Sequence, residues 1–367
     1  MEQLKARKFA GIDLRKDSVK LSIFDEGQGE MTEESFPLPA DGEEHFIPDG
    51  LDQVRKYMET NHLDWKEFQG VNFALEDPSA ENREILADKV GESFKQVHKV
   101  NVITVFRAFV EYVFHQERAV WDRNVLLLDF SEGKLSCIYV EQIRRSKQKA
   151  YKAVFSEIDT KEEVLLSDDP ELDHKFARMI KQFLVKHPAH VIYLTGKGFE
   201  GNWMKRTLNY LCAGRRVFLG QNLYANGACL LGLGTVALME EGMILMQGPY
   251  MVRHTIGVIS QENGRIRYVP VAPIGKEWYN TGGSIDIIMD KSQKVEFFYH
   301  NSTENEMECA TCEIRDLPVR PPKTSRLRVR VDFTSETSGV ILITDMGFGN
   351  MFPATGKVTV FPFKLIS

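Results

Sequence analysis

Two aspartates stand at the ends of apolar runs that read as strands, and each is followed by a turn and a second apolar run. Asp13 closes the run over 8–14 and Asp129 the run over 125–130, and a Lys-Leu-Ser triplet follows each turn. A carboxylate placed in this way can hold the hydrated magnesium ion that accompanies a bound phosphate, or it can cap the turn. The repeated pattern predicts a duplicated fold whose two hairpins face a shared cleft.

The two turns decide whether such a cleft can hold a phosphate. Backbone N–H groups must point at the anion, and glycine lets the chain approach it closely. The turns instead read Arg15-Lys16-Asp17 and Ser131-Glu132-Gly133-Lys134. A carboxylate such as Glu132 repels a phosphate by about 1 kcal/mol in water-like surroundings and by several in a partly buried cleft. Lys16 and Lys134 can offset this repulsion or pair with neighbouring acids. The turns therefore predict that hydrolysis of a phosphate compound bound in this cleft would be impaired.

The elements that position these turns follow an α/β pattern up to about residue 240, where apolar runs alternate with segments of helical spacing. The clearest helix covers 170–186, with Ser167 and Asp168 as caps and Pro170 in its first turn. The basic stretch over 144–152 is expected to be a solvated loop between strands.

After about residue 250 the pattern is all β. Strand-like segments follow one another with turns between them, and residues alternate strictly between apolar and charged over 326–333. This spacing predicts a β-sandwich. The expected organisation is a domain over 1–241, an apolar linker over 242–253 and a second domain over 254–367.

Composition excludes several classes of protein. The chain has 43% hydrophobic and 27% charged residues and a net charge of −6, which is typical of a soluble globular protein and unlike a nucleic-acid-binding one. Five cysteines, with one Cys309-x-x-Cys312 pair, indicate a reducing compartment more than a disulfide framework or a zinc site. No run is long and apolar enough for a signal peptide or a membrane span, so we expect a cytoplasmic protein.

The order of motifs resembles the actin-like ATPase superfamily, and in particular the 70 kDa heat-shock chaperones. Gly11-Ile12-Asp13-Leu14 is similar to the start of their first phosphate hairpin, and Asp129 to the start of their second. Further segments resemble their connecting strands and helices, adenosine-contacting loop, closing small-residue helix, apolar linker ("MILM") and substrate-binding β-sandwich: 71–90, 100–112, 191–208, 220–233, 243–246, 268–301 and 312–344. The resemblance covers nearly the whole chain and implies an actin-like α/β domain followed by an all-β sandwich.

The resemblance also implies site residues. Nucleotide contacts would come from Asp13, Leu14, Arg15, Lys16, Asp129, Ser131, Gly133, Lys134, Gly196, Gly198 and Phe199, with Asp13 and Asp129 holding magnesium if ATP binds. Phe199 stands near the family's stacking arginine, so it would either stack on adenine or pack into the core. An extended peptide would contact Tyr268, Val269, Ile288 and Val295, although Ile288 and Val295 would equally suit the sandwich core.

Several departures from the family weaken the case for hydrolysis. Arg15 replaces a turn glycine, the outer subdomains are short, the catalytic lysine has no counterpart, and no helical lid follows the sandwich. We therefore expect a degenerate, lidless, bacterial-type chaperone-like protein that binds a peptide or protein partner, without ATP hydrolysis and without a cofactor. The alternatives are an active switch that uses ATP and magnesium, and an actin-like assembly protein. The sequence does not fix the oligomeric state.

Overall fold

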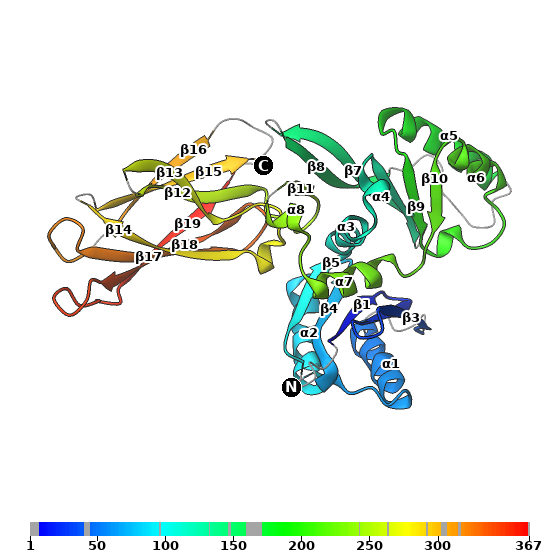
Figure 1. The fold of residues 1–367 in the computed structure, drawn as a ribbon, viewed down its shortest axis with the longest axis horizontal. Coiled ribbons are helices and arrows are strands. Elements are labelled where there is room, and N and C mark those ends of the chain that lie inside the picture. The colour runs from blue at the N-terminus through cyan, green and yellow to red at the C-terminus, as the bar shows by residue number, and fades with distance from the viewer. Residues whose placement is uncertain are drawn as a thin grey trace. The chain divides into compact units, whose positions relative to one another are not determined.

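The chain forms two compact units, Met1–Ile244 and Leu245–Ser367, in a computed structural model (Figure 1). The structure describes residues 7–39, 45–94, 97–131, 133–145, 148–158, 171–241, 243–262, 264–290, 293–301, 307–314 and 317–365. Glu132, Ser167, Asp168 and Pro170, which figured in the sequence predictions, lie outside the described residues.

The first unit begins with a five-stranded sheet in the order β3-β2-β1-β4-β5. Its strands are β1 (Lys8–Leu14), β2 (Ser18–Asp25), β3 (Glu30–Pro37), β4 (Phe68–Leu75) and β5 (Val100–Thr104). The first three strands are antiparallel neighbours, whereas β4 and β5 run parallel to β1. Strand β1 is buried along nearly its whole length, as a central strand covered on both faces must be.

The second half of this unit repeats the same topology. Five of the six strands of its sheet, in the order β8-β7-β6-β9-β10, correspond to the first sheet; they are β6 (Val125–Ser131), β7 (Lys134–Arg145), β8 (Gln148–Ile158), β9 (Val191–Thr195) and β10 (Arg216–Leu219). Strands β6, β7 and β8 are antiparallel neighbours, and β9 and β10 run parallel to β6. The matching strand orders give this unit the actin-like duplicated fold, and they place Asp13 and Asp129 near the ends of corresponding strands.

Helices pack around the two sheets. They are α1 (Phe46–Thr60), α2 (Ala80–Ser93), α3 (Val105–His115), α4 (Arg118–Trp121), α5 (Leu172–Lys186), α6 (Lys205–Cys212), α7 (Leu223–Leu233) and α8 (Ala237–Glu240), with 3-10 turns η1 (Trp65–Glu67) and η2 (Lys197–Phe199). Helix α5 matches the predicted helix but begins at Leu172. The described residues of the basic stretch over 144–152 lie on strands and not in a loop: Arg145 ends β7, and Lys149 and Lys152 lie on β8.

Small residues let α7 approach both its neighbours. A Cβ added to Gly11 of β1 would lie 2.0 Å from the Ala225 carbonyl oxygen of α7, and one added to Gly227 would lie 1.8 Å from the Ala108 carbonyl oxygen of α3. Such distances leave no room for a side chain. Glycine therefore fixes how closely α7 packs against β1 and α3, and with it the position of the residues that begin α7.

The second unit contains two four-stranded antiparallel sheets, ordered β13-β12-β15-β16 and β14-β17-β18-β19. Their strands are β12 (His254–Glu262), β13 (Arg265–Ala272), β14 (Gly282–Met289), β15 (Lys294–Asn301), β16 (Met307–Glu313), β17 (Ser325–Phe333), β18 (Ser338–Gly347) and β19 (Val358–Lys364), with a 3-10 turn η3 (Trp278–Asn280); β11 (Ile244–Gln247) lies at the division between the units. Buried residues of both sheets form one core cluster. The alternation predicted over 326–333 is confirmed, since the apolar residues of β17 are buried and its arginines exposed.

None of the helices among the described residues combines the length and the hydropathy that crossing a membrane would require.

Candidate functional site

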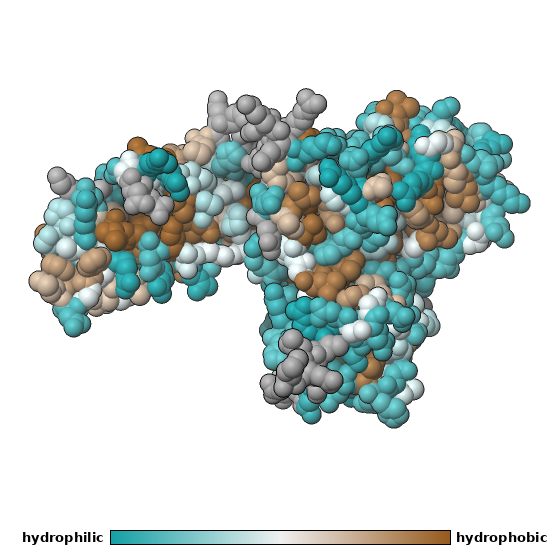
Figure 2. Space-filling model, in the orientation of Figure 1, coloured by the Kyte–Doolittle hydropathy of each residue, from teal (hydrophilic) through white to brown (hydrophobic). Residues whose placement is uncertain are grey.

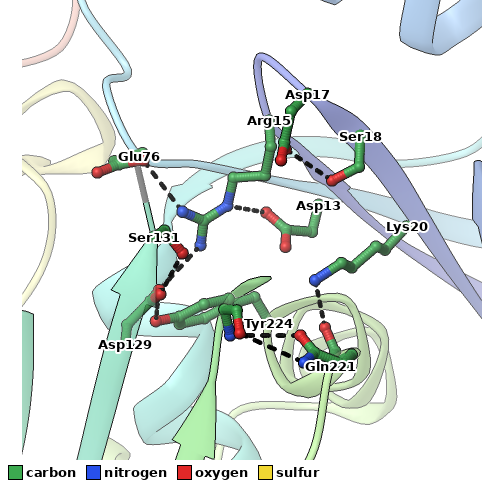
Figure 3. A network of polar contacts seen from close by, with 11 residues as sticks. Asp13, Arg15, Asp17, Ser18, Lys20, Glu76, Asp129, Ser131, Gln221 and Tyr224 are labelled. Carbon is green, nitrogen blue, oxygen red and sulfur yellow. Dashed lines mark hydrogen bonds and ion pairs between the residues drawn. The ribbon is translucent and has the colours of Figure 1, made fainter. Parts of the chain in front are cut away.

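The turn after β1 sends Arg15 into the space between the two predicted aspartates (Figure 3). Its Nε donates to Asp13 Oδ1 at 3.0 Å, and its Nη1 to Glu76 Oε2 at 3.0 Å. Its Nη2 lies 3.6 Å from Asp129 Oδ2. One guanidinium thus meets carboxylates from both halves of the duplicated fold.

Burial makes this cluster electrostatically strong. The Arg15 side chain is 12% exposed, and the side chains of Asp13 and Asp129 are 0% and 8% exposed. Burial alone would lower the pKa of Arg15, but the negative charges of Asp13, Asp129 and Glu76 outweigh it and hold that pKa well above its ordinary value. Arg15 is therefore a permanent internal cation between the two halves of the first unit.

Tyr224, in the first turn of α7, supports both members of the Arg15–Asp129 pair. Its hydroxyl donates to Asp129 Oδ2 at 2.7 Å, and the Arg15 guanidinium carbon lies 4.7 Å from the centre of its ring. Burial and the charge of Asp129 raise the pKa of Tyr224 well above its usual value, so the phenol stays a donor. Ser131 donates to the other oxygen of Asp129 at 2.5 Å, and both carboxylate oxygens are thereby bonded.

Further contacts tie the first hairpin to the second half of the unit. Lys197 Nζ lies 2.6 Å from Asp17 Oδ2, and the Lys20 ammonium donates to the Gln221 carbonyl oxygen at 2.5 Å. Burial raises the pKa of Asp17, but the hydrogen bonds from Lys197 and Ser18 lower it by more. The net shift of this pKa is therefore downward. The hairpin is thus fixed by ion pairs and hydrogen bonds that come from the chain itself.

The loop after β9, where the family resemblance placed adenosine contacts, is also occupied by side chains of the protein. The Gly196 N–H donates to the Gln221 side-chain oxygen at 3.3 Å, and the Gln221 amide donates to the Gly196 carbonyl at 3.4 Å. A Cβ at Gly196 would lie 2.4 Å from the Phe130 carbonyl oxygen, and one at Gly198 would lie 2.4 Å from the Phe130 ring. These two glycines are required for packing against β6.

The remaining predicted cleft residues are spread over different environments. Phe199 is 1% exposed and packs edge-on to the rings of Phe130 and Phe176, so it is a core residue. Leu14 is buried in the core of the first half. Lys16 and Lys134 are exposed, and Gly133 has a φ of +72° with open space at its Cβ position.

The resemblance implied a magnesium ion between Asp13 and Asp129, and the residues present do not fit it. Asp13 Oδ2 is buried and has no hydrogen-bond partner, as a metal ligand would be, but the Arg15 guanidinium stands between this carboxylate and Asp129. The Arg15 guanidinium already supplies a positive charge to both carboxylates, and that charge would repel a metal ion placed against it. Within the described ranges, no three His, Cys, Asp or Glu side chains converge as a metal site.

The four residues predicted to hold a peptide are not brought together. Val295 is 5% exposed and lies in the core of the second unit, whereas Ile288 is 56% exposed on a strand of the other sheet. Val269 packs against that core, and Tyr268 lies against Gly257 of the neighbouring strand. Of the predicted Cys pair, Cys309 is exposed and Cys312 buried, and both are free thiols.

Sequence reasoning missed Glu76, Lys197, Gln221 and Tyr224 as members of this cluster. Tyr224 follows Asp129 by 95 positions and comes from a different element, so no local spacing marks it. The available signal was the small-residue segment over 220–233, which had to pack closely on β1 and thereby bring its first residues to the cleft.

Two family models match the chain. The model described as "Family of unknown function (DUF5716) C-terminal" matches residues 44–247, more than half of the chain, and "Domain of unknown function (DUF8552)" matches residues 251–365. Neither description names a chaperone. No curated protein matches the chain.

Solved structures give weaker similarities. A reductive activator for corrinoid, iron-sulfur protein is 8% identical with a TM-score of 0.43, and the match spans 67% of this chain and 64% of that one, less than two thirds of its length. The ROK hexokinase from Thermus thermophilus is 13% identical (TM-score 0.35, 61% of this chain, 98% of that one). The ethanolamine utilization protein EutJ from Carboxydothermus hydrogenoformans is 13% identical (TM-score 0.40, 62% and 90%). The actin-like assignment rests on the duplicated strand order.

Proposed function

The chain belongs to the family of unknown function DUF5716, and we propose that its first unit is an actin-like module that closes its own cleft and acts by binding a protein partner, without hydrolysing ATP. The observation that carries the proposal is the position of Arg15 between Asp13 and Asp129, with contacts of 3.0 and 3.6 Å. A side chain of the protein supplies the positive charge that a bound metal ion would otherwise bring to these carboxylates.

The surrounding contacts support the same conclusion. A phosphate group entering the cleft would meet Asp13, Asp129 and Glu76 with one arginine among them, and the net charge of these four groups is −2. At an effective dielectric constant near 20, each unpaired like charge at about 4 Å costs about 4 kcal/mol. The Gly196 N–H that could receive an anion already bonds Gln221. Anion binding would require several of these contacts to break together.

We infer that the second unit is a β-sandwich that accompanies this module as a binding domain. Its two sheets share one core, which is the arrangement of sandwich domains that present surfaces to partners. The chaperone-type groove is no part of this proposal, because Ile288 and Val295 lie on different sheets. The partner is a protein or an extended peptide.

Calorimetric titration of the full chain with ATP and magnesium tests the proposal. We expect no saturable heat at millimolar nucleotide, no rise in melting temperature and no phosphate release. The competing function, a nucleotide-dependent switch, has the unpaired Asp13 Oδ2 in its favour as a cation ligand. It requires a concentration-dependent rise in melting temperature, because a ligand that binds only the folded state stabilises it. Such a rise would overturn the proposal.

A further inference from the structure

A cavity of about 370 Å³ opens between α3, α4, β9, β10 and the start of α7. It shares no lining residue with the cluster around Arg15. Its size is within the range that accommodates a large side chain or a small ligand. The residues that give it chemical character are Tyr112, Tyr193, Arg216, Phe218 and Leu219, and the carboxylate-bearing Glu117 also lines it where α4 begins.

The floor of the cavity is aromatic and preformed. Tyr193 is 4% exposed, with the Phe218 ring stacked on it at 5.2 Å and the Tyr112 ring edge-on at 5.6 Å. Burial raises the pKa of both tyrosines, so both phenols are neutral at physiological pH. Rings held by other rings lose little freedom when a guest packs on them, which favours binding of an apolar group.

Apolar surface continues out of the cavity onto β10. Phe218 is 37% exposed and Leu219 is 61% exposed, and beside them the Arg216 guanidinium carbon lies 5.3 Å from the centre of the Phe218 ring. Figure 2 shows apolar colouring gathered over the region of β9 and β10, among hydrophilic residues. A guest confined to the cavity would leave Leu219 in water, whereas an elongated one would cover it.

The backbone of β10 offers hydrogen-bonding groups along the same surface. This strand is the last of its sheet as far as the described residues extend. The N–H groups of Arg216 and Gly220 donate toward β9, to the carbonyls of His190 and Leu194. Because N–H groups along a strand alternate between its two edges, those of Val217 and Leu219 point to the outer edge. An added strand would find both donors there.

We propose that β10 and this cavity form a docking site for an extended segment of a partner protein, with an aromatic or large aliphatic side chain in the cavity and an adjacent acidic residue paired with Arg216. The acidic residue is indicated by charge complementarity, since Arg216 is exposed beside the cavity mouth. The inference rests on the proposed partner-binding function and names its site.

Panning a phage-displayed library of random peptides on the full chain tests this site. We expect enriched peptides to carry an acidic residue next to an aromatic or large aliphatic one. Panning on Leu219→Asp should lose this enrichment, because a carboxylate would then stand beside the cavity mouth. The matched control is Leu208→Asp on α6, since Leu208 is 37% exposed but does not line the cavity; enrichment should persist there.

The affinity of an enriched peptide, labelled with fluorescein, is then measured by fluorescence anisotropy. Variants of β10 show how much its backbone N–H groups and the charge of Arg216 contribute to that affinity. Val217→Pro removes an N–H that β9 does not use, and affinity should fall at least tenfold while the melting temperature stays within a few degrees. Arg216→Glu should reverse the charge preference toward lysine-containing peptides. The same enrichment on wild type and Leu219→Asp, or none at all, would refute the site. If N-acetylphenylalanine amide, which can fill the cavity but cannot pair along β10, competed with the same affinity as the peptide, pairing of the partner segment with β10 would be refuted. Neither result depends on nucleotide binding, so each is separable from failure of the proposed function.

Discussion

At the scale of single residues, one turn residue, Arg15, accounts for the character of the cluster around Asp13 and Asp129. A glycine at position 15 would leave Asp13 and Asp129 facing each other without a counter-charge, whereas Arg15 contacts both. Opposite charges with little access to water attract strongly, and the contacts with Glu76 and the Tyr224 ring fix the guanidinium further.

The first prediction concerns Arg15→Ala. Removing one partner of a buried ion pair leaves uncompensated carboxylates, so the free energy of unfolding should fall by about 3–5 kcal/mol. Magnesium ions should then stabilise the variant and leave wild type unchanged, because only in the variant is the space between Asp13 and Asp129 free of the Arg15 guanidinium. Denaturant unfolding with and without magnesium measures both effects.

The matched control is Arg7→Ala, which breaks an ion pair with Glu26 whose partners are 56% and 41% exposed. Exposed pairs contribute little to stability, so this variant should unfold nearly as wild type does. Equal stability of Arg15→Ala and Arg7→Ala would mean that the cleft cluster is not a tight ion-pair network.

A second residue-scale prediction concerns pH and the loop after β18. Two bonds from Arg320, at 2.7 and 2.8 Å, hold the pKa of Asp345 well below its usual value; burial opposes the shift and Thr355 adds to it. A carboxyl group with a lower pKa in the folded state contributes its full stability above a pH of about 4, the unfolded-state value, and loses it as pH falls through the folded-state pKa. Asp345→Asn should therefore melt below wild type at neutral pH, and the gap should narrow below about pH 4. Melting curves across pH measure it; a constant gap would contradict the assignment.

The sequence supported the paired aspartates and the unusual turn residue, because both lie within a short local pattern. It could not supply the partners of Arg15, since Glu76, Asp129 and Tyr224 come from three distant elements. Phe199 shows the opposite difficulty: its position in a loop resembled a binding site, but three-dimensional packing places it in the core.

At the scale of elements, the position of the site depends on how closely α7 packs. Gly227 to Ala should therefore lower stability by about 3 kcal/mol, since overpacking at a rigid contact forces the backbone apart. Gly91, inside α2, has nothing within 4 Å of its Cβ position. Alanine there should raise stability by about 0.5–1 kcal/mol through helix propensity.

Chemical denaturation of the two variants gives the comparison. A Cβ added at Gly227 would lie 1.8 Å from the Ala108 carbonyl oxygen. If the Gly227→Ala protein were as stable as wild type, α3 and α7 would not pack as closely as this distance implies.

Strongly periodic elements were predictable, and polar strands without a strict apolar alternation were not. The apolar spacing over 170–186 led to α5, and the alternation over 326–333 led to β17. Strand β8 and the end of β7 were missed because basic side chains on a long hairpin resemble those of a solvated loop. Strand β3 was missed for a related reason: most of its side chains are polar and largely exposed, as in a solvated loop. Charge pattern alone does not distinguish a loop from an edge hairpin.

At the scale of the whole molecule, the first unit is a duplicated module in which a side chain of the protein itself lies between the two matching aspartates. Its consequences concern partners: β10 and the adjoining cavity offer an apolar and hydrogen-bonding surface, and the second unit adds two sheets around one core. The duplicated topology was inferable from two copies of strand, Asp, turn and strand. That Ile288 and Val295 lie on different sheets was not, because alternation does not tell which sheet a strand joins.

A crystal structure of the full chain grown with ATP and magnesium would show whether Arg15 keeps its place between the two aspartates. We expect electron density for the Arg15 guanidinium between Asp13 and Asp129, with the Lys197–Asp17 contact intact and no triphosphate beside them. Density for a triphosphate and a metal ion at Asp13, with Arg15 turned out of the cleft, would contradict it.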